Sequence, residues 1–312
     1  MKAYEIKVKG KVLDYRIGKD LDLKEVRRFF AKNYKVKRIW QEKRHVVGIL
    51  EKNSIELFLK LSPTEGISAV TQIEYNWNDQ FNKLVSRKSN FWVPKNIYEG
   101  FYKKNLFYLI TDYFKGESIS EVPHKDNKGR DFKQYLLPII EFSELIQNLE
   151  IGELSEKDKE NHSKWFLEKT KAWYEAVPKS ILEKYKVNNL LEIVENGYLN
   201  LEKKTKHGDF TPWHMIKLNE KRIGLIDGEH AMNSGTEYYD TGYLIQRIFT
   251  VLKEPDFAKE FFQLLLKRNY NLEKLQVTLA ARAIGGFTDE AIIREKANYL
   301  RANKFKNWVL SL

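Results

Sequence analysis

The spacing of apolar residues changes once along the chain, after Gly116, and this change constrains the fold more than any other feature. Before it, short alternating segments typical of strands surround one long helical segment. After it, apolar residues recur at helical spacing. Strands followed by helices predict an α+β architecture rather than alternating β-α units. We therefore divide the chain into two lobes, residues 1–114 and residues 115–312.

Residues 1–114 are predicted to form a small, mainly antiparallel β-sheet with one long helix. Polar turns separate the alternating segments. The strands are expected at residues 36–40, 45–51, 54–61, 93–100 and 105–114. The long helix is expected at residues 67–84. Residues 1–30 add a hairpin and a short helix, which we expect to pack on this small lobe.

Residues 115–312 are predicted to be mainly helical, because their apolar residues form stripes at helical spacing. The stripes lie at residues 132–151, 162–177, 187–204, 258–269 and 272–284. The exception is residues 207–230, where MIKL and RIGLID flank a polar turn and predict a β-hairpin inside the helical lobe. This lobe is the larger of the two.

Composition limits the class of protein. With 42% hydrophobic residues in a chain of 312, the sequence can bury a sizeable core. It has no cysteine, which excludes disulfides, thiolate metal sites and a cysteine nucleophile. The first residues lack an apolar signal segment, and no stretch approaches the roughly 20 apolar residues of a membrane span. We expect a cytoplasmic protein without a membrane span.

The net charge of +11 is unevenly distributed. Residues 1–114 hold 23 Lys and Arg against 13 Asp and Glu, whereas residues 115–312 are nearly neutral. Part of the excess lies in the basic segment 32–44. Such a segment is either a nucleic-acid or phosphate patch or a solvated strand face with lysines at alternate positions. We favour the strand face and consider a nucleic-acid partner unlikely.

One carboxylate falls within the apolar stripe of the long helix. The stripe consists of Val70, Trp77, Phe81 and Leu84, and Glu74 lies inside it at the i+4 step. A carboxylate on a buried face requires a cation. Lys60 lies just upstream in the apolar run LFLKLS, so we expect a Lys60–Glu74 pair. The alternative is a lysine that extends to solvent and a glutamate at the edge of the stripe.

The hairpin in residues 207–230 brings polar residues together. If Leu218 pairs with Arg222 or Ile223, a turn about Glu220 and Lys221 predicts a register with Met215 opposite Ile226. The same register places His214 opposite Asp227, with Cβ atoms about 4.5–5.5 Å apart. We therefore expect a potential metal-binding pair at the base of the hairpin.

Asp209 precedes this hairpin by a short loop, so two carboxylates and one imidazole can surround a single opening. Each residue alone has an ordinary structural explanation. Asp209 could cap a turn, Asp227 could end a strand, and His214 could be a half-buried histidine. A hydrophobic core has no need of three polar residues at converging strand ends. The combination therefore favours a functional site.

The segment HGDFTPWHM followed by GLIDGE resembles the HGD-x4-N and IDxE signatures of the aminoglycoside phosphotransferase family. That family includes choline, homoserine and fructosamine kinases and shares the two-lobed protein kinase-like fold. The resemblance extends from about Val36 onward. It implies that Asp209 is the catalytic base or orienter of an acceptor hydroxyl and that Asp227 holds Mg²⁺ on the nucleotide phosphates. His214 occupies the position of the family's second metal ligand, an asparagine.

The resemblance also implies roles for residues outside this segment. Lys60, paired with Glu74, would contact the α/β-phosphates of ATP. Residues Thr111, Asp112 and Tyr113 would form the hinge that reads the adenine edge. Imidazole is a softer ligand than Mg²⁺ prefers, so His214 leaves Mn²⁺, a single metal ion or lost activity as alternatives.

Three residues are expected to support the site. By the same resemblance, Asp240 braces the catalytic loop, and His207 orients that loop. Glu229 supports either the metal site or its loop. In the turn where protein kinases carry a glycine-rich loop, this chain has Lys43 and Arg44. These two residues either supply charge to the phosphates or are ordinary exposed cations.

The leading interpretation is an ATP-dependent phosphotransferase that moves the γ-phosphoryl group to a hydroxyl of a small metabolite. A sugar, an aminoglycoside-like compound and an amino alcohol are all compatible acceptors. The first alternative is a catalytically impaired, nucleotide-binding pseudokinase that serves as a scaffold. The second is a nucleic-acid-binding protein that uses the basic N-terminal lobe.

Overall fold

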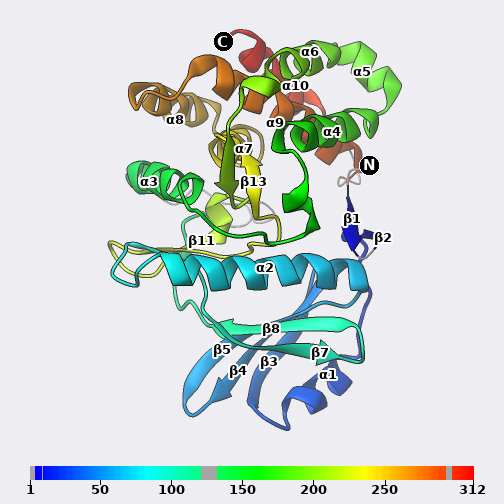
Figure 1. The fold of residues 1–312 in the computed structure, drawn as a ribbon, viewed down its shortest axis with the longest axis vertical. Coiled ribbons are helices and arrows are strands. Elements are labelled where there is room, and N and C mark those ends of the chain that lie inside the picture. The colour runs from blue at the N-terminus through cyan, green and yellow to red at the C-terminus, as the bar shows by residue number, and fades with distance from the viewer. Residues whose placement is uncertain (1–3, 9, 121–131, 293–296) are drawn as a thin grey trace. The chain divides into compact units, whose positions relative to one another are not determined.

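The computed structural model describes residues 4–8, 10–120, 132–292 and 297–312 (Figure 1). The chain forms two compact units. The first, which we call the sheet unit, contains Tyr4–Ser118 and His214–Ala231. The second, the helical unit, contains Ile119–Trp213 and Met232–Leu312. A small antiparallel sheet and a mainly helical part are thus both present, as the change in spacing predicts.

A five-stranded antiparallel sheet with the order β3-β4-β5-β8-β7 is the centre of the sheet unit. Its strands are β3 (Lys35–Glu42), β4 (His45–Lys52), β5 (Ile55–Leu61), β7 (Asn96–Tyr102) and β8 (Leu106–Asp112). The three interior strands, β4, β5 and β8, are mostly buried. All five strands lie where the alternating segments predict them.

The two-residue period of β5 sends its side chains to opposite faces. Leu57, Leu59 and Leu61 enter the core that packs against helix α1 (Leu23–Phe30). Lys60 therefore faces the other side, where helix α2 (Glu65–Leu84) lies along the sheet (Figure 1). The alternation of β5 thus directs one lysine toward α2.

Helix α2 begins at a Thr64 cap, whose hydroxyl accepts a hydrogen bond from the Ile67 N–H at 3.3 Å. The predicted stripe is buried at Val70, Trp77 and Phe81. Leu84 was wrongly placed in that stripe. It is 52% exposed because the helix ends there.

The predicted N-terminal hairpin and short helix are present as β1 (Glu5–Val8), β2 (Lys11–Asp14) and α1. The hairpin contacts the start of α2 at Gly66. A Cβ atom at Gly66 would lie 2.0 Å from the backbone oxygen of Asp14. Only glycine allows the two backbones to approach this closely.

Strands β11 (Met215–Lys217) and β12 (Ile223–Leu225) form the predicted hairpin. They belong to a second sheet with the order β6-β12-β11-β9, in which β6 is Phe91–Trp92 and β9 is Glu117–Ser118. This pairing explains why residues 214–231 group with the sheet unit. The predicted division placed all of residues 207–230 in the helical lobe and differs from the structure in this respect.

Of the two pairings considered for Leu218, the one with Arg222 is present: the Leu218 N–H donates to the Arg222 carbonyl at 2.9 Å. The predicted register at Met215 is wrong by one residue. Met215 pairs with Leu225, not with Ile226. The side chain of Asn219 accepts hydrogen bonds from the N–H groups of Lys221 and Arg222, at 3.0 and 2.9 Å. This local turn lengthens the loop to three residues and so moves the register.

The helical unit is built around α9 (Leu272–Ile292), which packs against α4, α6, α7 and α10. These are α4 (His162–Glu175), α6 (Asn188–Gly197), α7 (Tyr239–Thr250) and α10 (Leu300–Leu310). The unit also contains α3 (Leu136–Gln147), α5 (Lys179–Tyr185) and α8 (Pro255–Lys267).

A strand pair, β10 (Lys203–Lys206) with β13 (Met232–Thr236), completes the helical unit. Residues 187–204 were predicted to be helical throughout, but α6 ends at Gly197 and β10 starts at Lys203. Across the described residues, no helix is both long and apolar enough to cross a membrane.

Candidate nucleotide and phosphoryl-transfer site

Lys60 lies at the centre of an ionic network in the sheet unit. Its Nζ lies 2.6 Å from Glu74 Oε2. The same atom lies 2.5 Å from Asp227 Oδ1 and 2.9 Å from Glu229 Oε1. The predicted Lys60–Glu74 pair is therefore present, joining β5 to α2, and the lysine also reaches the segment after β12.

The electrostatics of the network follow from its burial. Burial alone would lower the pKa of Lys60, but the three carboxylates raise it well above its usual value. Burial raises the pKa of Glu74 to about 7, even though Lys60 opposes this. Burial raises the pKa of Asp227, but Lys60, together with His214 and Arg44, outweighs burial and holds this pKa below its usual range. Lys60 and Asp227 are therefore both charged at neutral pH.

Glu229 is only 1% exposed and holds several partners at once. Arg44 pairs with its Oε2 atom. The other oxygen, Oε1, lies 2.9 Å from His45 Nε2 and 3.1 Å from Thr71 Oγ1. Burial raises the pKa of the Glu229 carboxyl, but Arg44 and then Lys60 outweigh this and lower it. Glu229 therefore supports the lysine and fixes the turn before β4.

Arg44 is not an ordinary exposed turn cation. Its side chain is 24% exposed, it pairs with buried Glu229, and it donates a hydrogen bond to the Tyr15 carbonyl at 3.2 Å. Its roles as anchor of the turn and partner of Glu229 were not predicted from the sequence. His45 and Thr71 were not predicted either. Each lies in a mainly apolar segment, HVVGIL and ISAVTQI, whose pattern indicates only a strand or a helix.

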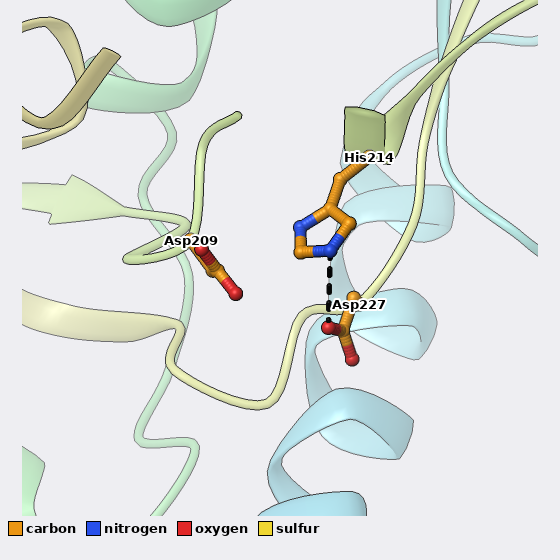
Figure 2. A group of neighbouring side chains, drawn as sticks. All are labelled: Asp209, His214 and Asp227. Carbon is orange, nitrogen blue, oxygen red and sulfur yellow. Dashed lines mark ion pairs between the residues drawn. The ribbon is translucent and has the colours of Figure 1, made fainter. Parts of the chain in front are cut away.

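His214 and Asp227 lie next to each other (Figure 2). His214 Nε2 is 3.5 Å from Asp227 Oδ2. The corrected register places the His214 carbonyl against the Ile226 N–H, at 3.0 Å, rather than against Asp227. Asp227 follows the strand with φ of 68°, a left-handed conformation that is uncommon for residues other than glycine. The side chains of His214 and Asp227 are therefore adjacent, as expected, although the two residues are not directly opposite each other in the hairpin.

Asp209, also labelled in Figure 2, belongs to the helical unit and lies on the loop after β10. Asp240 fixes this loop by accepting hydrogen bonds from the N–H groups of His207 and Gly208, at 2.7 and 2.8 Å. Gly208 has φ of 84°, which favours glycine. Asp240 and His207 are buried, whereas Asp209 remains partly exposed. Asp240 is thus placed as the predicted brace.

The predicted hinge residues lie at the end of β8: Thr111 and Asp112 are its last two residues, and Tyr113 follows it. Thr111 is buried, and its hydroxyl donates a hydrogen bond to the Asp112 carbonyl at 3.1 Å. The Asp112 carboxylate accepts a hydrogen bond from the Lys95 N–H at 2.6 Å, so it fixes the backbone of its own unit. The Tyr113 ring stacks on Phe58, with ring centroids 6.3 Å apart. Phe58 lies on the same face of β5 as Lys60.

The donor atoms around Asp227 fit a hard divalent cation. Its carboxylate is 27% exposed and ionised, as Mg²⁺ requires. Glu74, Asp227 and Glu229 each offer an oxygen within 4.8 Å of the others, but Lys60 Nζ already contacts all three carboxylates. The second oxygen of Asp227, Oδ2, is the one that faces His214 and can bind a cation. His214 adds a nitrogen ligand, which suits Mn²⁺ better than Mg²⁺. The residues present can therefore hold one divalent cation through Asp227.

Comparisons by sequence identify no relative: no family model matches the chain, and the search of curated proteins found no match. Comparisons of structure find solved proteins with a similar fold. A thermostable mutant of an aminoglycoside phosphotransferase, solved in a ternary complex with AMP-PNP and hygromycin B, has a TM-score of 0.70 at 12% identity. The alignment covers 92% of this chain and 98% of that one.

A choline kinase from Streptococcus pneumoniae has a TM-score of 0.56 at 13% identity, over 93% of this chain and 99% of its own. The chain therefore has the protein kinase-like fold of aminoglycoside phosphotransferases and choline kinases. This confirms, for the fold, the resemblance that the HGD and IDGE motifs indicate.

Proposed function

We propose that this protein is an ATP-dependent phosphotransferase that moves the γ-phosphoryl group to a hydroxyl of a small molecule. One observation carries the proposal: Lys60 bridges Glu74 and Asp227 in a chain with this fold. Phosphoryl transfer depends mainly on positioning and on neutralisation of phosphate charge. A fixed lysine and an ionised aspartate supply both.

In the proposed mechanism, Lys60 holds the α/β-phosphates of ATP, and Glu74 keeps its ammonium in place. The backbone of residues 111–113 pairs with the adenine edge. A divalent cation, held by Asp227 with His214 as a second ligand, would neutralise phosphate charge. Asp209 accepts a hydrogen bond from the acceptor hydroxyl, orients its oxygen and takes its proton. That oxygen bonds to the γ-phosphorus while the bond from the γ-phosphorus to the bridging oxygen of ADP breaks, and ADP leaves.

An acceptor screen with labelled ATP tests this proposal. Purified protein is incubated with sugars, amino alcohols and hydroxy acids, in Mg²⁺ and in Mn²⁺. We expect labelled product with at least one acceptor. Binding of ATP without transfer or hydrolysis in either metal would instead support the pseudokinase alternative, for which His214 in place of asparagine is the specific argument.

A further inference from the structure

Three basic side chains are buried together in the helical unit. Lys206 ends β10 and is 2% exposed, Lys169 lies on α4 and is 8% exposed, and Arg282 lies on α9 and is 5% exposed. We call them the cation cluster. Lysine and arginine are rarely this deeply buried, because an isolated charge loses its hydration there. Burial of three cations in one region therefore requires an explanation.

Shared aromatic rings show that these cations form one group. The Tyr239 ring centroid lies 3.8 Å from Lys206 Nζ and 5.8 Å from Arg282 Cζ. The Trp173 ring lies 4.7 Å from Arg282 Cζ and 5.8 Å from Lys169 Nζ. Each ring therefore contacts two cations. Such contacts partly compensate a buried cation for its lost hydration.

The sequence builds this cluster from separate elements. Trp165, Lys169 and Trp173 recur every four residues and so share one face of α4. Trp165 lies 4.4 Å from Lys206 Nζ. Gly235 on β13 makes room for that lysine, because a Cβ atom there would lie 2.6 Å from Lys206 Cγ. The position of Lys206 thus depends on the absence of a side chain on the neighbouring strand.

Two members of the cluster, Lys206 and Arg282, form no ion pair within the described part of the chain. No carboxylate there lies within 4.0 Å of Lys206 Nζ or of the Arg282 guanidinium, and Arg282 Nε is buried without a hydrogen-bond partner. Asp240 attracts Lys206, but both of its oxygens accept hydrogen bonds from the loop that carries Asp209. Burial, followed by the neighbouring cations, lowers the pKa of Lys206 to about 7.

The cluster adjoins the loop of the proposed catalytic base. Lys206 precedes Asp209 by three residues. Tyr243 lies with its ring centroid 4.0 Å from Arg282 Cζ, and burial raises the pKa of its phenol, with Asp209 among the charges that act on it. Asp209, Tyr243 and Arg282 are therefore neighbours within the helical unit. A molecule whose hydroxyl reaches Asp209 can extend toward these cations.

We propose that the cation cluster binds an anionic group, a carboxylate or a phosphate, on the acceptor molecule. Arg282 can offer two N–H groups to a planar carboxylate or a phosphate, and Lys206 adds a point charge. A cationic acceptor such as a polyamine would be repelled. This inference rests on the proposed function and narrows its acceptor to hydroxylated anions, such as sugar acids or sugar phosphates.

Anion binding without ATP provides the test. Thermal unfolding is followed with inorganic phosphate and, separately, with malonate, each against sodium chloride at equal ionic strength. The chains compared are wild type, Lys206→Met, Arg282→Gln and the control Lys203→Met, which removes an exposed charge from the same strand. We expect at least one anion to stabilise wild type and the control, with affinity at least tenfold weaker in both cluster variants.

The two probes distinguish the anion: stabilisation by phosphate alone indicates a phosphorylated acceptor, and stabilisation by malonate alone a carboxylate. Equal stabilisation of all four chains would overturn the inference, because the anion then binds elsewhere, for example at Lys60. If one cluster variant fails to fold, the other still decides. Transfer to neutral acceptors at rates unaffected by Lys206→Met would reject the inference while leaving the proposed function intact. Absence of any transfer would reject the proposed function, whereas the unfolding experiment would still show whether the cation cluster binds an anion.

Discussion

Lys60 has three buried or partly buried carboxylate partners, and its loss would leave them close together without a cation. Its side chain is 11% exposed and that of Glu74 is 7% exposed. The pair was predictable from sequence, because a glutamate inside an apolar stripe requires a cation and the preceding strand offers one. The third partner, Glu229, was not assigned to Lys60, because nothing in its local sequence shows that it is buried.

Substitution Lys60→Met should lower the free energy of unfolding by about 3 kcal/mol, since breaking a buried ion pair leaves charges uncompensated. Urea unfolding at pH 7 measures this. Lys83→Met is the matched control, because Lys83 also lies 2.6 Å from a carboxylate, Asp79, but is 69% exposed. Its loss should be below about 1 kcal/mol. Equal losses in the two variants would show that burial of the Lys60 network carries no energetic weight.

The cation cluster has a pH signature at Lys206. Burial, followed by the repulsion of Lys157, Lys169 and Arg282, lowers its pKa from 10.5 to about 7, although Asp240 opposes this. Between these values the unfolded chain binds more protons than the folded chain, so the contribution of Lys206 to stability rises with pH. Lys206→Met should therefore be more stable than wild type near pH 6, by on the order of 2 kcal/mol.

This advantage of Lys206→Met should shrink as the pH rises from about 7 to about 10, where the unfolded lysine also loses its proton. Urea unfolding of both chains across this range measures it. If the stability difference between Lys206→Met and wild type stays constant or grows with pH, the charge of Lys206 does not destabilise the folded protein.

At the level of elements, the strands and helices that carry strong periodicity were predicted, and the pairing between them was not. The hairpin of β11 and β12 was expected, but its register depends on hydrogen bonds of Asn219 that set a three-residue loop. Short strands such as β6 and β9 have only two residues each, too few to show alternation. They form because the hairpin offers unpaired edges.

At the contact between the N-terminal hairpin and α2, helix propensity and packing predict opposite effects of a glycine-to-alanine substitution on stability. Alanine is normally favoured over glycine in a helix by about 1 kcal/mol. At Gly66, however, a Cβ atom would lie 2.0 Å from the Asp14 backbone oxygen. We expect Gly66→Ala to destabilise the protein by about 1–3 kcal/mol. A rise in melting temperature would show that the hairpin does not pack on α2 in this way.

For the whole molecule, the positive charge of the N-terminal part is partly compensated on the strand surface. Lys35 and Lys37 lie 2.9 and 2.8 Å from Glu51, and Lys37 also lies 2.6 Å from Glu56. These cross-strand pairs support the interpretation of residues 32–44 as a solvated strand face. The net charge alone could not distinguish that surface from a nucleic-acid site.

Nucleic-acid binding should accordingly be weak at physiological salt. Fluorescence anisotropy with duplex DNA and single-stranded RNA, at about 50 and 200 mM salt, measures it. We expect low affinity that varies little between sequences. Tight binding with a steep salt dependence would favour the nucleic-acid alternative instead.

The cation cluster illustrates what the sequence alone conceals. Its members come from α4, β10 and α9, and each looks like an ordinary basic residue in a helix or strand. The spacing of Trp165, Lys169 and Trp173 indicates one helix face but gives no sign that the face is buried against two further cations. Local signatures such as HGD and IDGE indicate the segment of the proposed catalytic residues, whereas the proposed acceptor region depends on tertiary packing.

The most direct test of the account is γ-phosphoryl transfer by wild type and by Asp209→Asn. The two chains are compared with the best acceptor from the screen and the same divalent cation, and ATP affinity is measured in parallel. A catalytic base contributes roughly a hundredfold or more to the rate. We predict at least that loss in Asp209→Asn, with ATP affinity unchanged within about twofold. Transfer by Asp209→Asn at the wild-type rate would contradict the assignment of Asp209 and, with it, the proposed mechanism.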